Sequence, residues 1–469
     1  MHTTPMRRSL AATLSTLMLA GCASVDHDAA FGPVAQAAQE HVGQPIRWTR
    51  DADQRAASDA RVAELLAQPI GPDAAVQIAL LNNRGLQAAF EQLGITEAER
   101  VQALRLPNPG FSFGRLRRGD EVEIERGLHL DLARLLAAPI VGRLEARRVE
   151  RAQQAALLQV LSLAADARKA QVQAVAAEET VRYRRQVQEA ADAGAELARR
   201  MAEVGNFSKL QRLREQGFLA DAALNVARAE RERISARERL TRLMGLWGPQ
   251  TRFTLPDRLP DLPATPDDLP DVERDAITRR LDVRAARLAA EQTAANLGLT
   301  KATRFINVLE LGVQHNSSNE APRQTGWEIG VELPLFDTGD ARLARAEGVY
   351  LQAVHRTAET AVNARSEVRE AYAGYRHAWD IARHHRDELV PLRRQIADEN
   401  LLRYNGMLIG VFELLADARA QVAGVNAYIE ALRDFWLARA DLDMARLGPT
   451  RLTPPAGSAP AAAADGAGH

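Results

Sequence analysis

A long stretch without proline constrains this chain more than any other feature. Residues 140–248 contain no proline, and the first turn signal among them is Gly205-Asn206. About 65 residues precede that turn, and at about 1.5 Å per residue they would form a helix of roughly 100 Å. Typical globular helices have three or four turns, so a helix of this length needs a partner along its side. Residues 208–244 can return alongside it as an antiparallel limb.

The C-terminal limb has the spacing of a coiled coil. Its apolar positions follow one another at alternating intervals of four and three residues: Val411, Leu415, Ala418, Val422, Val425, Ile429, Leu432 and Trp436. This 3.5-residue period, kept over about four heptads, predicts a left-handed supercoil. We therefore expect two helical hairpins, at about 138–245 and about 340–447, and the second should turn near Tyr404-Asn405-Gly406.

A pair of alternating segments precedes each predicted hairpin. Residues 110–132 place Phe111 and Phe113 between small or polar residues, with a charged turn at 115–121. Residues 305–335 alternate in the same way around a polar turn from His315 to Gln324. These segments predict two β-hairpins. Soluble sheets alternate similarly, so the pattern alone leaves open a membrane barrel piece or a domain edge.

The plan of helix, two strands and long hairpin occurs twice. Arg-Gly-Leu-Gln-Ala-Ala at 84–89 is mirrored by Leu-Asp-Val-Arg-Ala-Ala at 281–286, 197 positions later. The predicted fold class is mainly α with a small β part. Continuous helices are expected from Asp73 to 106 and from Asp271 to about 302. The predicted organisation is a signal segment 1–21, an N-terminal segment 22–70, repeat 1 at 71–247, a Pro- and Asp-rich connection 248–270, repeat 2 at 271–448 and a disordered tail 449–469.

The N-terminus has the layout of a bacterial export signal. Arg7-Arg8 precede an apolar run of about 13 residues, too short to span a bilayer as a helix. Leu-Ala-Gly-Cys at 19–22 resembles a lipobox, which implies cleavage before Cys22 and covalent lipid, including palmitate, on that residue. Since Asp does not follow Cys22, delivery to the outer membrane is expected. An ordinary secretory signal is the alternative; Cys22 is the only cysteine, so an internal disulfide is excluded.

Composition and the number of predicted strands limit the functions that the chain can have. With 60 Lys+Arg against 61 Asp+Glu, the chain lacks the basic excess used to bind nucleic acid. The smallest bacterial single-chain barrels have about eight strands, so four strands cannot close a barrel alone. If the strands enter a membrane, several copies must share one barrel, because an open sheet edge cannot face lipid.

In this layout the chain resembles the TolC-like outer-membrane factors of tripartite efflux pumps, in a lipoprotein subtype. The resemblance covers residues 60–448. It is carried by Leu-Pro-Asn-Pro at 106–109, Leu-Asp-Val-Arg-Ala at 281–285, Leu-Pro-Leu-Phe-Asp-Thr-Gly at 333–339, Arg-Tyr-Asn-Gly at 403–406 and Phe-Glu-Leu-Leu at 412–415.

The resemblance implies a lipid-anchored homotrimer with a shared twelve-stranded barrel in outer-membrane lipid. It also implies a helical tunnel across the periplasm, with a belt that includes 248–270. Such a duct would be passive and not an enzyme. It would have no cofactor apart from the lipid, and its partners would be a periplasmic adaptor and an inner-membrane transporter. The exported substrate, whether drug, metal ion, solvent or polypeptide, and the cognate pump stay open.

The resemblance also suggests site residues at the two helical tips. Tyr404, Glu413 and Asp417 are the candidates for a periplasmic constriction, where three carboxylates would attract cations. The family order Leu-Leu-Asp-Ala is Leu-Leu-Ala-Asp here at 414–417, so which carboxylate would face the lumen stays open. A solvated outer face is the alternative. The adaptor-contact candidates are Lys209, Arg212 and Glu215; here the alternative is a simple helix start capped by Ser208.

Other readings have little support in the residues. His384-His385 are adjacent, so they diverge by about 100° on a helix and cannot easily bind one metal ion. His315 is expected to be solvated in its turn. No nucleophile elbow, zinc-binding His-Glu-x-x-His or phosphate-binding glycine loop is present in the sequence, which argues against a hydrolase. An acylated periplasmic coiled-coil tether is the alternative to the duct.

Overall fold

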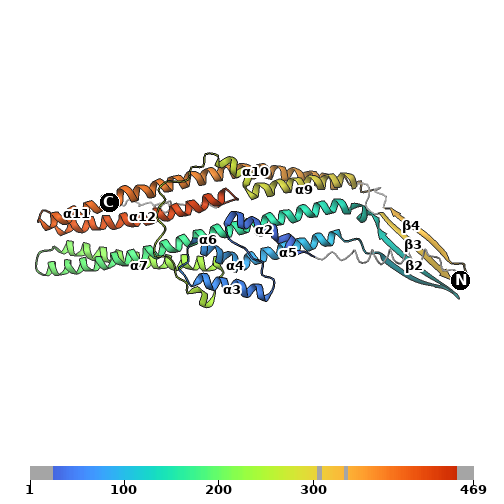
Figure 1. Cartoon of the computed structure of the whole chain (residues 1–469), viewed down its shortest axis with the longest axis horizontal. Helices are drawn as coiled ribbons and strands as arrows, with labels where there is room; N and C mark the ends of the chain where they lie inside the picture. Colours follow the sequence, from blue (N-terminus) through green and yellow to red (C-terminus); the bar gives the residue numbers. More distant parts are fainter. Residues whose placement is uncertain (1–24, 304–308, 332–335, 451–469) are drawn as a thin grey trace, which may run out of the picture. The chain divides into compact units, whose positions relative to one another are not determined.

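The computed structural model describes residues 25–303, 309–331 and 336–450, so the expected signal segment, Cys22 and most of the tail lie outside it. The described chain is mostly helical with one four-stranded antiparallel sheet (Figure 1), which confirms the predicted fold class. The chain divides into two compact units. Unit 1 is Met1–Gln36, Ala88–Leu157 and Asp282–Ala361, and unit 2 is Ala37–Gln87, Leu158–Leu281 and Val362–His469. Both sequence repeats therefore contribute to both units.

The sheet belongs to unit 1 and has the order β1-β2-β3-β4. β1 (Gly110–Arg118) and β2 (Glu121–Asp131) form one hairpin, and β3 (Leu309–Ser318) and β4 (Gln324–Val331) form the other. β2 pairs with β3, which brings the two repeats together. The side chain of Asn319 fixes this join: it accepts from Val122 N–H (2.7 Å) and donates to the Asp120 carbonyl (2.9 Å). His315, expected in a turn, lies within β3.

The first helical hairpin consists of α6 (Leu132–Glu203) and α7 (Lys209–Met244). α6 has 72 residues and starts directly after β2, with Pro139 inside it; the Asp131 carboxylate accepts the Arg134 N–H at 2.9 Å. Gly205 makes the turn with a φ of +80°, a conformation that glycine adopts without strain. Ser208 then caps α7, which was the alternative interpretation of this segment. Its hydroxyl accepts from Gln211 N–H while the Gln211 side chain accepts from Ser208 N–H.

The second helical hairpin contains an interruption that the sequence analysis did not anticipate. α10 (Asp340–His384) is followed by one π-helical turn, His385–Leu389, before α11 (Val390–Asn405) and the returning α12 (Val411–Ala445). Pro391 follows the π turn; it has no N–H, and its ring would clash with the carbonyl four residues earlier in an α-helix. The wider turn, in which Val390 N–H bonds to the His385 carbonyl, accommodates this proline without ending the helix.

The two helices expected from Asp73 and Asp271 are each broken, so the prediction of continuous helices was wrong. The first becomes α4 (Pro72–Asn82) and α5 (Arg84–Leu104), separated at Asn83. The second becomes α8 (Val272–Arg279) and α9 (Leu281–Thr303), separated at Arg280. At both residues ψ is extended, 119° and 127°, so the chain turns before the helix resumes.

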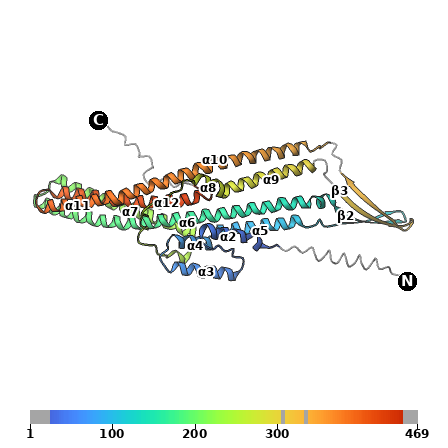
Figure 2. The ribbon, with the colours of Figure 1, turned by 45° about the horizontal axis from the view of Figure 1, so that its top comes forward.

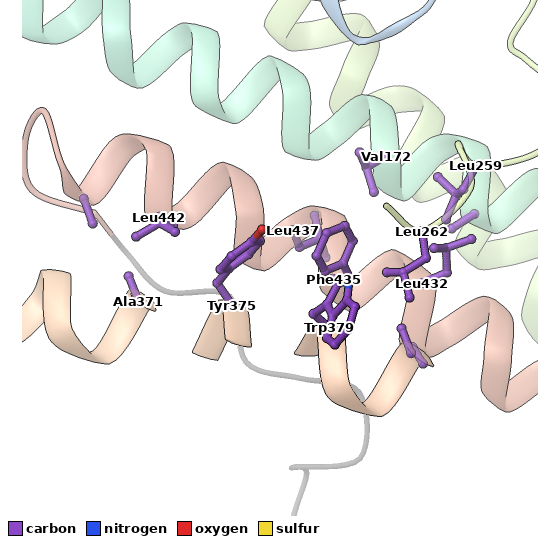
Figure 3. Close-up of a cluster of buried hydrophobic side chains, with 14 of the residues drawn as sticks. Val172, Leu259, Leu262, Ala371, Tyr375, Trp379, Leu432, Phe435, Leu437 and Leu442 are labelled. Carbon is purple, nitrogen blue, oxygen red and sulfur yellow. The ribbon is translucent and has the colours of Figure 1, made fainter. Parts of the chain in front are cut away.

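The connection 248–270 is irregular after a short 3₁₀ helix, η1 (Gly248–Thr251), and is held by aromatic side chains of unit 2. The Trp379 indole donates to the Pro263 carbonyl (3.0 Å), the Trp436 indole to the Pro260 carbonyl (3.0 Å), and the Tyr375 hydroxyl accepts the Asp267 N–H (2.9 Å). Figure 3 shows Tyr375 of α10 facing Phe435 of α12, with a ring-centroid distance of 5.6 Å. These contacts bury part of the connection against α10 and α12.

The remaining helices pack locally. α2 (His27–Val42) contributes Phe31, whose ring meets Phe90 edge to face at 5.0 Å in unit 1. In the same unit α9 and α10 run side by side (Figure 2), and Thr357 of α10 donates to the Ala286 carbonyl of α9 at 3.1 Å. α3 (Ala52–Leu66), capped by Asp51, buries Val62 in the core of unit 2 with Ile70, Ile78, Leu240 and Met244.

Candidate functional site

One face of the sheet is apolar and exposed. The register places Phe111, Leu128, Val313 and Trp327 in one row across all four strands. The Trp327 side chain is 74% exposed and that of Phe111 67%. The row nearer the helices contains Leu130, Leu311 and Ile329. Contiguous exposed apolar surface of this kind marks contact with lipid or with another protein.

The opposite face of the sheet is polar and acidic. Six carboxylates occupy it against one guanidinium, that of Arg118: Glu121, Glu123, Glu125, Asp131, Glu310 and Glu328. Gln314 donates to Glu328 at 2.6 Å. At Gly110 an added Cβ would lie 2.6 Å from the ring of His129, so a larger residue there would have to displace that ring. The two faces therefore suit two different surroundings, an apolar one and water.

The tip of the first helical hairpin combines exposed apolar side chains with ion pairs. Val204 is 71% and Leu210 58% exposed. Just before the turn, the Glu196 carboxylate contacts Arg199 (2.8 Å) and Arg200 (2.7 Å). Hydrogen bonds from these two guanidinium groups lower the pKa of Glu196 to about 2. This part of the tip therefore keeps its charges over any physiological pH.

The tip of the second hairpin is more apolar. Met407 has a φ of +59° and is 93% exposed, and Leu408 is 77% exposed. A positive φ is uncommon for a residue other than glycine, and here backbone bonds from Met407 N–H to Tyr404 O (3.0 Å) and from Leu408 N–H to Arg403 O (2.9 Å) hold the turn. The turn thus presents two large apolar side chains to the exterior.

An ion pair joins the two hairpins within unit 2. The Glu215 carboxylate of α7 is almost fully buried, and one of its oxygens lies 2.5 Å from the Arg419 guanidinium of α12. Arg419 also stacks over the Phe218 ring at 4.2 Å from its centroid. No described residue forms a hydrogen bond with the other Glu215 oxygen, and Glu215 also lines a cavity of about 60 Å³ formed mainly by apolar side chains of α6, α7 and α12. Breaking this pair would be costly, because it would leave the buried Glu215 carboxylate without its counter-charge.

The constriction candidates lie near the second tip in different surroundings. Tyr404 of α11 is 39% exposed. Glu413, in the first turn of α12, is exposed. Asp417 lies one turn further along α12 and accepts a hydrogen bond from the Asn400 side chain of α11. Of the two carboxylates, Glu413 is therefore the one presented to solvent, and their role in a constriction remains a prediction.

The adaptor-contact candidates also differ from one another. Lys209 is exposed at the first residue of α7, whereas Arg212 is half-buried. Glu215 is buried beside Arg419, so its side chain is not part of the exposed surface of the tip. The sequence patterns did not predict that Glu215 pairs with Arg419, or that Arg419 stacks over Phe218. No local spacing relates residues 204 positions apart on two different hairpins.

No metal-binding or membrane-spanning helical feature is found in the described residues. Among these residues, no group of three or more His, Cys, Asp and Glu side chains could hold a metal ion. His384 lies 3.2 Å from Glu388, and burial together with neighbouring His384 lowers the pKa of His385. None of the described helices is both long and apolar enough to cross a membrane.

Comparison with known proteins finds a partial match in sequence. No known protein-family profile matches the chain. The cobalt-zinc-cadmium resistance protein CzcC of Cupriavidus metallidurans is 26% identical over 293 residues, which is 60% of this chain and 66% of that protein. The match thus spans slightly less than two thirds of the relative.

Solved structures show the same fold over most of the chain. The open state of the Neisseria gonorrhoeae MtrE outer-membrane channel has a TM-score of 0.67 and 19% identity, covering 83% of this chain and 89% of that one. CusC, described for its transmembrane channel formation, has a TM-score of 0.65 and 16% identity, covering 83% and 92%. The resemblance drawn from the sequence is confirmed in fold: this chain has the fold of the outer-membrane channel proteins.

Proposed function

We propose that this chain is one subunit of a passive exit duct in a bacterial outer membrane, the last part of a tripartite efflux system. The observation that carries the proposal is the sheet with two unlike faces. Its apolar face would contact lipid, and its acidic face would line a water-filled passage. No bond is made or broken in this function; the chain supplies only a wall.

The open edges of the sheet support an assembly of several copies. β1 and β4 each pair on one side only in the described chain, and an unpaired edge is too costly to face lipid. Neighbouring copies would pair β4 of one with β1 of the next. We propose a homotrimer, in which twelve strands close one barrel.

The charge of the polar face supports cations as the substrate class. Six carboxylates against Arg118 give each copy a strongly negative wall, and a ring of such walls would concentrate cations. The relative CzcC is named for resistance to cobalt, zinc and cadmium, all of which form divalent cations. We propose that this chain passes metal cations as cargo, without retaining them in a binding site.

The helical tips are the proposed contact with a periplasmic adaptor, which an inner-membrane transporter would feed. The support lies in the apolar side chains exposed at both turns, Leu210 in one and Met407 with Leu408 in the other, beside the cationic Lys209. Glu413 is the proposed carboxylate of a constriction at this end. The proposed lipid on Cys22 would add an anchor, and a shift in mass after Cys22→Ser would test it.

Planar-bilayer conductance of the purified full chain, with the oligomeric mass measured in the same preparation, tests the proposal. We expect a trimer that opens cation-preferring channels. Glu413→Gln should reduce the cation preference, whereas Asp417→Asn, whose carboxylate is engaged by Asn400, should change it less. A monomer or dimer that binds membranes but does not conduct would contradict the duct and favour the acylated coiled-coil tether. Channels that prefer anions would overturn the assignment of the substrate class.

A further inference from the structure

The apolar face of the sheet ends in a set of arginines. Toward the strand turns, the row after Phe111 and Trp327 contains Arg126 and His315, and the following rows contain Arg115 and Arg117. Along a strand, successive rows are about 6.7 Å apart. All of these side chains share the apolar face, because residues directly opposite one another in a sheet point the same way.

Among the described residues, these arginines have no carboxylate partner. Arg117 donates to the Gly119 carbonyl (3.1 Å) and Arg126 to the Ser317 hydroxyl (3.4 Å), while Arg115 is exposed. No described residue of this face is acidic, since every carboxylate of the sheet lies on the other side. Three guanidinium groups are thus kept on the apolar face, apart from the carboxylates that could neutralise them.

We propose that these arginines form a docking surface, the arginine girdle (Arg115, Arg117 and Arg126), for the phosphate groups of anionic lipids. The inference goes beyond the duct and rests on it only for the direction of the sheet in the membrane. The helices attach at one end of the strands and the turns lie at the other. A chain exported with its helices in the periplasm therefore has this girdle in the outer leaflet, at the level of the headgroups.

Charge and geometry both favour a phosphate headgroup as the occupant. Guanidinium groups bind phosphate oxygens in pairs of parallel hydrogen bonds, and lipid tails of the same molecule can cover Phe113 and the apolar row below. A zwitterionic headgroup offers the same phosphate but adds a positive charge that three guanidinium groups repel. The girdle should therefore select lipids by net charge.

The chain contains a matched control for this surface. Arg118 follows Arg117 in the same strand and is also exposed, but it lies on the acidic face opposite Glu121. Arg118→Gln removes the same charge at nearly the same height. It should leave lipid selection unchanged, whereas Arg115→Gln, Arg117→Gln and Arg126→Gln should each weaken it.

Native mass spectrometry of the full chain released from mixed phosphatidylcholine and phosphatidylglycerol nanodiscs tests the girdle. We expect the wild type to retain phosphatidylglycerol preferentially. Each arginine near a charged surface contributes about fivefold, so the triple variant should lose on the order of a hundredfold in that preference. Inorganic phosphate at matched concentration should not displace the lipid, because it lacks the tails.

Several outcomes would overturn the proposal. These are an equal retention of both lipids by the wild type, an equal loss in Arg118→Gln, or displacement by inorganic phosphate, which would indicate a plain anion site. If the triple variant does not insert, the three single variants give the same comparison. Conductance is measured on the same samples. Lipid preference without channels refutes the duct alone, and channels without lipid preference refute the girdle alone.

Discussion

The helix breaks at Asn83 and Arg280 both lie against the end of a returning helix, but different side chains stabilise them. They lie 197 positions apart, and each backbone N–H bonds at 2.9 Å to an alanine carbonyl four residues earlier. Each break also meets the C-terminal end of a returning helix. At the first, the Asn82 amide donates to the carbonyls of Met244 (3.0 Å) and Gly245 (2.8 Å), and the Asn83 amide to that of Leu243 (3.0 Å).

The second break uses a charge for the same purpose. Arg280 is 1% exposed and donates to the Ala445 carbonyl of α12 (3.1 Å) and to Glu367 of α10 (2.7 Å). The final carbonyls of a helix lack partners within it, so both breaks supply donors to an open helix end. A neutral amide can be buried with its hydrogen bonds alone, whereas a guanidinium also needs a carboxylate. The second break therefore also involves α10, through Glu367, and in the described chain the first break uses no such third helix.

The largest predicted effect follows from removing the buried charge. Arg280→Met should lower the free energy of unfolding by about 3 kcal/mol, since it removes a buried guanidinium that pairs with the partly exposed Glu367 and donates to a helix-end carbonyl. Unfolding in denaturant followed by circular dichroism measures it. Arg279→Met, which changes an exposed neighbour, is the control. If both variants lower the free energy of unfolding equally, the charge of Arg280 does not stabilise the second break.

A smaller effect is expected from a glycine beside the first break. Gly245 has a φ of +66°, and an added Cβ would lie 2.8 Å from the Asn82 carbonyl oxygen. Gly245→Ala should therefore cost about 2 kcal/mol of stability, from left-handed backbone strain and a backbone clash. At Gly448, after α12, an added Cβ meets only movable side-chain atoms of Leu158 and Met444. Gly448→Ala should cost less when both variants are unfolded in denaturant; the reverse order would show that the two breaks are not packed as described.

Removing the neutral donors should cost less again. Asn82→Ala leaves the carbonyls of Met244 and Gly245 without their side-chain donor, and we expect a loss of about 1.5 kcal/mol. Hydrogen exchange at the end of α7 should report the loss locally. Asn82→Asp retains the size but not the donor, so it should be at least as destabilising. A stable Asn82→Asp variant would contradict the role given to the amide.

The π turn at His385–Leu389 is an interruption of another kind, and the described part of the first helical hairpin has no counterpart to it. Burial and His384 lower the pKa of His385 below its ordinary 6.5, so the unfolded chain binds its proton more readily than the folded chain. The stability that this group contributes is complete above about pH 6.5 and is lost as the pH falls through that region. His385→Gln should make the stability less sensitive to acid, by under about 1 kcal/mol. Melts at pH 5 and pH 8 measure the difference, and an unchanged slope would contradict the assignment.

Sequence patterns predicted the features that depend on neighbours along the chain. The long hairpins follow from the absence of proline and the 3.5-residue period, and the Ser208 cap follows from its place after Gly205. The breaks at Asn83 and Arg280 were not predicted because neither residue is a strong helix breaker. Contacts with distant carbonyls decide their conformation. The pairing of Glu215 with Arg419 is likewise a product of two hairpins meeting, which no local pattern encodes.

The turn between β1 and β2 has a consequence for how the chain tolerates change. It contains only Gly119 and Asp120, with Gly119 at a φ of +62° and Arg118 directly opposite Glu121. Lengthening a turn does not change which residues pair: in the second hairpin seven residues, 317–323, separate the paired Asn316 and Gln324, and both faces are kept. One residue added within β1 or β2 would instead exchange the acidic and apolar sides of that strand beyond it, or force a bulge. Natural length variation should therefore fall in the turn and be eliminated from the paired strands.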